Sequence, residues 1–179
     1  GCTRDDAAGE CFDKIARVLG LPYPGGKPME DLAEGGDDTK YPLPRAKIAG
    51  CALDMSFSGL KTAAVNLVHN AGQKGEEIDR SSLAASVAAA ISEELVPRAI
   101  RAAEQCGYKT LAAAGGVAAN KRIRAGLERA CREKGIKLYL PPLSLCGDNG
   151  AMIGCQAYYE YLAGVRGDMS LNAYANLEI

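Results

Sequence analysis

The 179-residue sequence has no tryptophan, only two phenylalanines and a single histidine, His69. Iron and zinc sites usually take imidazole ligands, so this chain is poor in the residues that such a site needs. His69 lies in an expected helix next to a loop, where a surface or packing role is the usual one. Aromatic residues are not interleaved with the basic ones, which argues against a surface that stacks nucleic-acid bases.

Paired cysteine motifs are also missing. The seven cysteines are scattered, odd in number and without a CxxC spacing, which argues against a disulfide framework and a zinc site. The sequence shows no signal or transit peptide and no run of about 18 apolar residues. We therefore expect a soluble protein in the reducing cytoplasm, with no membrane partner.

Neither sign of charge dominates. The chain has 21 Lys and Arg against 22 Asp and Glu, a net charge of -1, so any contact with nucleic acid must come from a local patch. What the sequence does have is 47% hydrophobic residues, enough for one substantial core with a small appended lobe.

Alternating elements in the second half of the chain indicate the fold class. KTLAAAGG reads as a short buried strand that ends in two glycines, NKRIRAGLERACREKG as a basic helix, and IKLYL as a second strand. A strand, glycine turn, helix and strand form a parallel crossover, so we expect an α/β fold with additional helices. A final strand is also possible in SLNAYANLEI.

Two helices with buried stripes are expected before this unit. SFSGLKTAAVNLVHNAG has helical spacing, and the next helix is capped by Asp79, Ser81 or Ser82. Within that helix, Pro97 should produce a kink, and Glu94 with Arg98 reads as a surface ion pair. Residues 32–56 are rich in Gly, Pro and charge, and we expect loops there with at most a short hairpin.

The opening stretch GCTRDDAAGECFDK predicts a helix with two different faces, capped by Asp5 or Asp6 and ending near Gly20. One face is apolar and suits a core. The opposite face gathers Asp6, Gly9, Glu10 and Asp13. These carboxylates repel one another and a helical glycine is unfavourable, so the face is either a solvated acidic surface or the wall of a ligand site.

Two glycine-rich helix starts are candidate binding elements. Gly115 and Gly116 lack the Cβ that would block close approach, so the amides after them could meet a phosphate or nucleotide, together with Asn120. The alternative is a tight turn with Asn120 as an ordinary cap. In LCGDNGAMIG, Asp148 is either a structural N-cap or a hard oxygen ligand for a metal ion, although one carboxylate is too few for a site.

The helix after Asn120 is strongly basic, with seven Lys and Arg between Lys121 and Lys137. A solvated face is the default interpretation, and a patch that contacts RNA is the alternative. In the last expected helix, three tyrosines are better interpreted as packing residues than as a stacking platform. They are Tyr158, Tyr159 and Tyr161.

Five motifs occur in a fixed order along the whole chain: DDAAGECFDK, LGLPYPGG, SFSGLKTA, AGGVAAN and CGDNGAMI. Taken together they resemble the C-terminal half of the TsaD family, also called Gcp and formerly labelled O-sialoglycoprotein endopeptidase. The resemblance implies a lobe of the actin and Hsp70-like ATPase superfamily, an α/β fold with a ribonuclease-H-like sheet and additional helices. Residues 1–179 would be the C-terminal lobe of a two-lobe enzyme whose N-terminal lobe is absent. Residues 1–80 would line the cleft, and 81–179 would form the α/β core.

The family's activity would then be that of an acyltransferase acting on tRNA. Its members transfer the threonylcarbamoyl group from threonylcarbamoyl-adenylate to N6 of adenosine 37 in tRNAs that read codons beginning with A. The implied partners are tRNA and the other subunits of the modification complex, including a paralogous family member. The implied cofactor is one divalent metal, iron or zinc, whose two histidine ligands lie in an HxxxH motif that this chain lacks. We expect the chain to be inactive alone.

The resemblance also implies roles for individual residues. Asp148 would be the carboxylate ligand of the metal. The residues expected to bind the adenylate are Asp13, Gly26, Glu30, Gly115, Gly116 and Asn120. Lys27 stands where the family usually has proline, and Gly147 where it usually has threonine.

Two other functions compete with this one. The old metalloendopeptidase label is disfavoured because the sequence has neither an HExxH helix nor a Ser/His/Asp set. A noncatalytic module that binds nucleotide or partner proteins remains the other alternative, and removal of an N-terminal lobe should expose an apolar face on such a chain.

Overall fold

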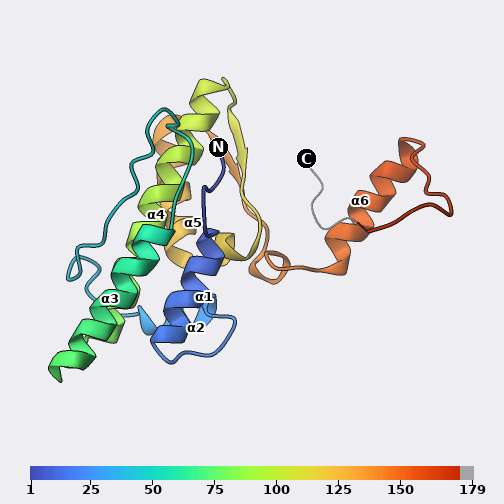
Figure 1. Cartoon of the computed structure of the whole chain (residues 1–179). Coiled ribbons are helices and arrows are strands. Elements are labelled where there is room, and N and C mark those ends of the chain that lie inside the picture. Colours follow the sequence, from blue (N-terminus) through green and yellow to red (C-terminus); the bar gives the residue numbers. More distant parts are fainter. Residues whose placement is uncertain (174–179) are drawn as a thin grey trace.

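A computed structural model describes residues 1–173, which form an α/β arrangement dominated by helices (Figure 1). Its sheet is small, consisting of two strands. The elements in chain order are α1 (Ala8–Val18), α2 (Gly26–Leu32), α3 (Ser58–Lys74), α4 (Arg80–Gln105), β1 (Thr110–Ala112), the 3-10 helix η1 (Gly116–Ala119), α5 (Lys121–Lys134), β2 (Lys137–Tyr139), the 3-10 helix η2 (Leu143–Leu145) and α6 (Gly150–Leu162).

The expected strand–helix–strand unit is confirmed. β1 and β2 pair in parallel, with Leu111 opposite Leu138, and α5 makes the crossover between them. Gly126 lets α5 approach α4 closely, because a Cβ at this position would lie 3.1 Å from both Ser92 Oγ and Val96 Cγ2. The α5 stripe of Ile123 and Leu127 is thereby buried against the core.

α4 is the central helix of the core. Every residue from Ser82 to Ser92 is buried, and α2, α3 and α5 pack around this segment. As expected, Asp79 caps the helix, since its carboxylate accepts hydrogen bonds from the Ser82 backbone N–H (3.1 Å) and hydroxyl (2.7 Å). The helix continues through Pro97 to Gln105.

The expected cap of α1 is wrong. α1 begins after Ala7, whose N–H is bonded by the Glu10 side chain, and Asp5 instead accepts hydrogen bonds from the N–H groups of Phe57 and Ser58 at the start of α3. Asp5 therefore caps a helix that lies about fifty positions further along the chain, a long-range pairing that helical periodicity does not report.

Glu94 and Arg98 form a pair inside the protein and not on its surface. The Glu94 side chain is 5% exposed and its Oε2 lies 2.5 Å from Arg98 Nη1. Glu94 Oε1 also accepts the Ala46 N–H, while Arg98 donates to the carbonyl of Asp54. The pair is buried because the loop before α3 covers it. No hairpin forms in that loop, and Met55 instead makes one parallel bridge with Thr3.

α6 lies apart from the rest of the protein (Figure 1). No residue of this helix is buried, and Tyr158, Tyr159 and Tyr161 are 57–64% exposed, so the expectation that these tyrosines pack in a core is wrong. Residues 170–173 form no strand, and the remainder of the expected final strand lies outside the described residues.

Within residues 1–173, no helix is long and apolar enough to cross a membrane. All seven cysteines are free thiols, as expected.

Candidate functional site

A cavity of about 640 Å³ lies between α1, α2, η1 and the start of α5. Five of the six residues expected to bind a nucleotide line it, although they come from α1, α2, η1 and the residue that caps α5. They are Asp13, Gly26, Glu30, Gly116 and Asn120. Gly115 precedes η1 and turns the chain with a φ of +92°, a conformation that favours glycine. The fold therefore brings the sequence candidates together, while their roles stay predictions.

Asp13 holds the loop between α1 and α2 in place. Its Oδ1 accepts the Gly25 N–H at 2.6 Å. A Cβ at Gly25 would lie 2.4 Å from Ala16 Cβ, so this position needs glycine if the loop is to lie against α1. Gly26 is different, because a Cβ there would meet nothing within 4 Å. Its missing side chain keeps part of the cavity open.

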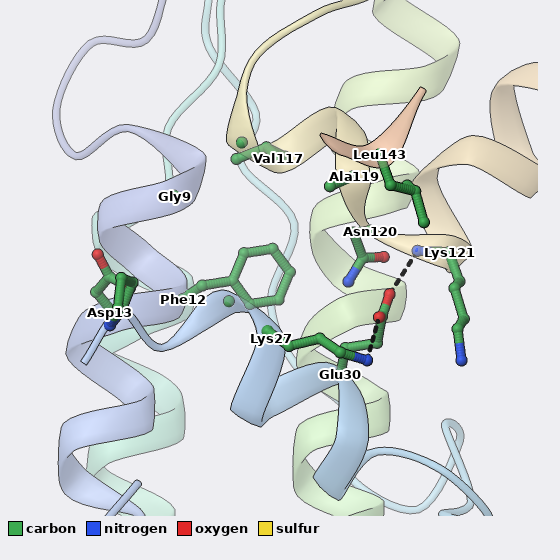
Figure 2. A pocket seen from close by; sticks show the side chains of 13 residues that line it. Gly9, Phe12, Asp13, Lys27, Glu30, Val117, Ala119, Asn120, Lys121 and Leu143 are labelled. Carbon is green, nitrogen blue, oxygen red and sulfur yellow. Dashed lines mark hydrogen bonds and ion pairs between the residues drawn. The ribbon is translucent and has the colours of Figure 1, made fainter. Parts of the chain in front are cut away.

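Glu30 and Asn120 both engage the beginning of α5 (Figure 2). Glu30 Oε1 accepts the Lys121 N–H at 2.6 Å, and Asn120 Oδ1 accepts those of Arg122 (3.0 Å) and Ile123 (3.2 Å). Asn120 is therefore a helix cap, and its amide nitrogen is left to serve as a donor toward the cavity.

The glycine turn differs from the expected geometry. We expected the strand to run from the paired glycines straight into a helix whose first amides would face a ligand. Instead η1 intervenes, and the amides of Lys121, Arg122 and Ile123 are bonded within the chain. The first amides of α5 therefore already have partners within the chain, and of the two glycines of the turn Gly116 lines the cavity.

The polar face of α1 divides into two parts. Asp6 bonds Lys61 (2.5 Å) and Lys14 (2.9 Å), and these contacts lower the pKa of its carboxyl. Glu10 also pairs with Lys14, at 2.7 Å. The carboxylates of Asp6 and Glu10 are thus compensated within the fold and do not line the cavity.

Gly9 and Asp13 are the part of that face that lines the cavity. A Cβ on Gly9 would lie 3.4 Å from Val117 Cγ2, an ordinary contact, so packing alone does not demand glycine here. Phe12 belongs to the apolar face of α1 and is buried, and its ring extends from this helix toward the cavity that it lines (Figure 2).

Asp148 is exposed, and the cap of α6 is its neighbour Asn149, whose Oδ1 accepts the Met152 N–H at 3.0 Å. In the part of the chain that the structure describes, no group of three His, Cys, Asp or Glu side chains could hold a metal ion. The single histidine, His69, lies on α3 beside Gln73, with their Nε2 atoms 3.0 Å apart. Asp148 can therefore supply one ligand at most, and the residues present do not fit a complete iron or zinc site.

Three of the six basic residues of α5 make contacts within the fold. Arg122 pairs with Asp38, Lys134 with Glu104 at 2.8 Å, and Arg124 donates to the carbonyl oxygens of Pro141 and Ala118. Lys121 lines the cavity, a placement that the sequence analysis missed, as it did for Lys27, Pro24 and Leu143.

Comparison with known proteins shows which family the chain matches. The family described as TsaD, tRNA N6-adenosine threonylcarbamoyltransferase, matches residues 1–155. Proteins named tRNA N6-adenosine threonylcarbamoyltransferase match the chain from end to end. That of Moorella thermoacetica is 50% identical over 179 residues, which are 100% of this chain and 52% of the relative. That of Latilactobacillus sakei is 51% identical over 180 residues, covering 99% of this chain and 52% of the relative. The chain spans about half the length of the curated relatives it matches.

Proposed function

Because the chain belongs to the TsaD family, we propose that it is the adenylate-binding part of a tRNA N6-adenosine threonylcarbamoyltransferase. In this reaction the N6 amine of adenosine 37 of a tRNA reading ANN codons attacks the carbamoyl carbon of threonylcarbamoyl-adenylate. The new C–N bond forms, the bond from that carbon to the phosphate oxygen breaks, AMP leaves, and N6 gives up one proton to the solvent. The observation that carries the proposal is the convergence of Asp13, Gly26, Glu30 and Asn120 on one cavity.

The cavity offers complementary chemistry for an adenosine group. Phe12, Val117 and Leu143 provide apolar wall on which an adenine ring can lie. The Asp13 carboxylate uses one oxygen for the Gly25 N–H, which leaves the other to accept from ribose hydroxyls. The Asn120 amide can donate to the same ligand. These residues would bind and orient the adenylate and retain AMP as the leaving group.

The family membership also supports our proposal for the architecture. The parallel β1–α5–β2 unit is consistent with part of a ribonuclease-H-like sheet in an actin and Hsp70-like lobe. We propose that residues 1–179 form the C-terminal lobe of a two-lobe enzyme, with 1–80 lining the cleft and 81–179 forming the α/β core. The other lobe would close over the bound nucleotide.

Asp148 is proposed as one ligand of a metal site that this chain does not complete. Joining this chain to the part of the Moorella thermoacetica relative that it does not match provides a test. In such a protein, Asp148→Ala should lower the iron or zinc content measured by mass spectrometry. Unchanged metal content would contradict the ligand assignment.

A partner-binding role is the second candidate, and the exposed apolar residues of α6 favour it. Partner subunits of the modification complex, including a paralogue, and tRNA are proposed to bind the complete enzyme. Transfer activity separates the candidates: the joined protein should modify tRNA, whereas this chain alone should not. A joined protein that binds its partners normally but never transfers the group would support the noncatalytic module.

Calorimetric titration with AMP tests the adenylate site directly. Asp13→Asn keeps an oxygen for the Gly25 N–H but removes the charge that would bind the ribose, so we expect both AMP and adenosine to bind about tenfold more weakly. Asp31→Asn is the matched control, because Asp31 is an exposed carboxylate on α2 that does not line the cavity. Equal losses in the two variants would contradict the role of Asp13.

A further inference from the structure

The cavity contains a balanced set of charges. Four of its lining residues are charged, two acidic and two basic: Asp13, Glu30, Lys27 and Lys121. An adenylate carries a negative phosphate, so the carboxylates on the cavity wall would repel it unless their charge is compensated. The residues that compensate these carboxylates therefore decide which ligands the cavity can accept.

Glu30 is the lining carboxylate that forms an ion pair with a lysine of the cavity wall. Its side chain is 15% exposed, and its Oε1 is fixed on the Lys121 N–H at 2.6 Å. This contact joins α2 to the start of α5 across the cavity. An anion that enters the cavity therefore meets the Glu30 carboxylate on one of its walls.

Lys27 supplies the counter-charge. It lies one turn before Glu30 on α2, and its Nζ is 3.3 Å from Glu30 Oε2 and 2.6 Å from Asp31 Oδ1. Figure 2 shows the resulting row of Lys27, Glu30 and Lys121 along one side of the cavity. The carboxylates of Asp31 and Glu30 raise the pKa of Lys27, so the ammonium remains charged at neutral pH.

We propose that Lys27 is a specificity-determining residue, which neutralises Glu30 and thereby allows the cavity to accept the anionic group of an adenylate. The inference rests on the proposed function of this cavity. Without the Lys27 ammonium, the lining side chains would carry two negative charges and one positive charge. The cavity would then discriminate against AMP and tolerate adenosine, which has the same base and ribose but no phosphate.

The test is calorimetry of the 179-residue chain and its variants with adenosine and with AMP, at low and high salt. For Lys27→Met, we expect AMP to bind about fivefold to tenfold more weakly at low salt, with adenosine within about twofold of the unchanged chain. High salt should shrink the effect on AMP, because exposed charges are screened.

Two further variants provide controls. Asp31→Asn removes the carboxylate outside the cavity and leaves Lys27 with Glu30, so AMP should bind as well as before or more tightly. Adding Glu30→Gln to Lys27→Met removes both charges of the pair and should restore much of the lost preference for AMP. Circular dichroism checks that each variant is folded.

The outcomes separate this inference from the function on which it rests. Selective loss of AMP binding with rescue in the double variant would support the role of Lys27. Parallel loss of AMP and adenosine, or no change in either, would overturn the role of Lys27 while leaving the adenylate site standing. Failure of the unchanged chain to bind either ligand would overturn both the adenylate site and the role of Lys27.

Discussion

α4 and α6 are both rich in apolar residues, but their surroundings are opposite. α4 buries every residue from Ser82 to Ser92, whereas α6 has none buried and exposes Ile153, Tyr159 and Leu162 by 61–64%. The difference shows that an apolar helix contributes to a core only where other elements surround it. α4 has α2, α3 and α5 as neighbours, and the same packing shapes the cavity beside α1.

Truncation of a buried side chain on α4 should have the largest effect. Ile91 is fully buried, so Ile91→Ala should lower the free energy of unfolding by about 2–5 kcal/mol through lost burial and a residual cavity. Ile153→Ala on α6 is the matched control, and it should change stability by less than about 0.5 kcal/mol. Urea unfolding followed by circular dichroism measures both. Similar losses would show that α6 is packed in solution.

Breaking the buried ion pair between Glu94 and Arg98 should have the second largest effect on stability. Arg98→Met leaves Glu94 charged beneath the loop without its partner, and we expect a loss of about 2–3 kcal/mol, below the cost for a fully buried pair because Arg98 is 18% exposed. Arg45→Met is the control, since Arg45 pairs with Glu93 on the surface of the same region. If the two variants unfold at the same urea concentration, the buried pair contributes no more than a surface pair.

Removal of α6 should matter less to folding than to association. Deleting residues 147–179 should leave the stability of the remaining chain within about 1 kcal/mol, because α6 contributes no buried residue. The exposed apolar surface would be removed at the same time, so sedimentation should show less self-association. A deletion that unfolds the chain would refute the separation of α6 from the core.

The smallest expected effect is the pH dependence of the α4 cap. Hydrogen bonds from Lys40 and Ser82 hold the pKa of Asp79 well below its ordinary value. A depressed pKa contributes stability above the unfolded-state value of about 3.9, and this contribution is lost as the pH falls further. The stability difference between the unchanged chain and Asp79→Asn should therefore shrink below about pH 4. Thermal melts of both proteins at a series of pH values measure this difference. A stability difference that stays constant with pH would show that the charge of Asp79 does not contribute to the cap.

Local patterns in the sequence predicted the parallel unit, the cap of α4 and the α-helices except α2, which begins at the second glycine of LPYPGG. They also predicted five residues of the cavity, because glycines and polar residues at helix starts stood out, and the ordered motifs resembled one family. Contacts between distant segments were missed. Asp5 bonds the start of α3, and Ala46 reaches Glu94, and neither partner is visible from periodicity.

α6 was misjudged for a related physical reason. Its three tyrosines resemble a packing stripe, yet packing requires a second surface, and helical spacing does not say whether one is present. In the sequence, Lys27 was interpreted as a departure from the family pattern, and Lys121 as part of a basic helix. Only the approach of α2 to α5 places both beside Glu30 on the same cavity.

The most direct test of the central claim is to map AMP binding on the 179-residue chain by amide chemical shifts. We predict that millimolar AMP shifts the amide resonances of Asp13, Gly26, Val117 and Asn120 and leaves those of α6 unchanged, because the cavity and not the exposed helix binds the adenylate. Shifts confined to α6, or a spectrum without changes, would contradict the proposed site.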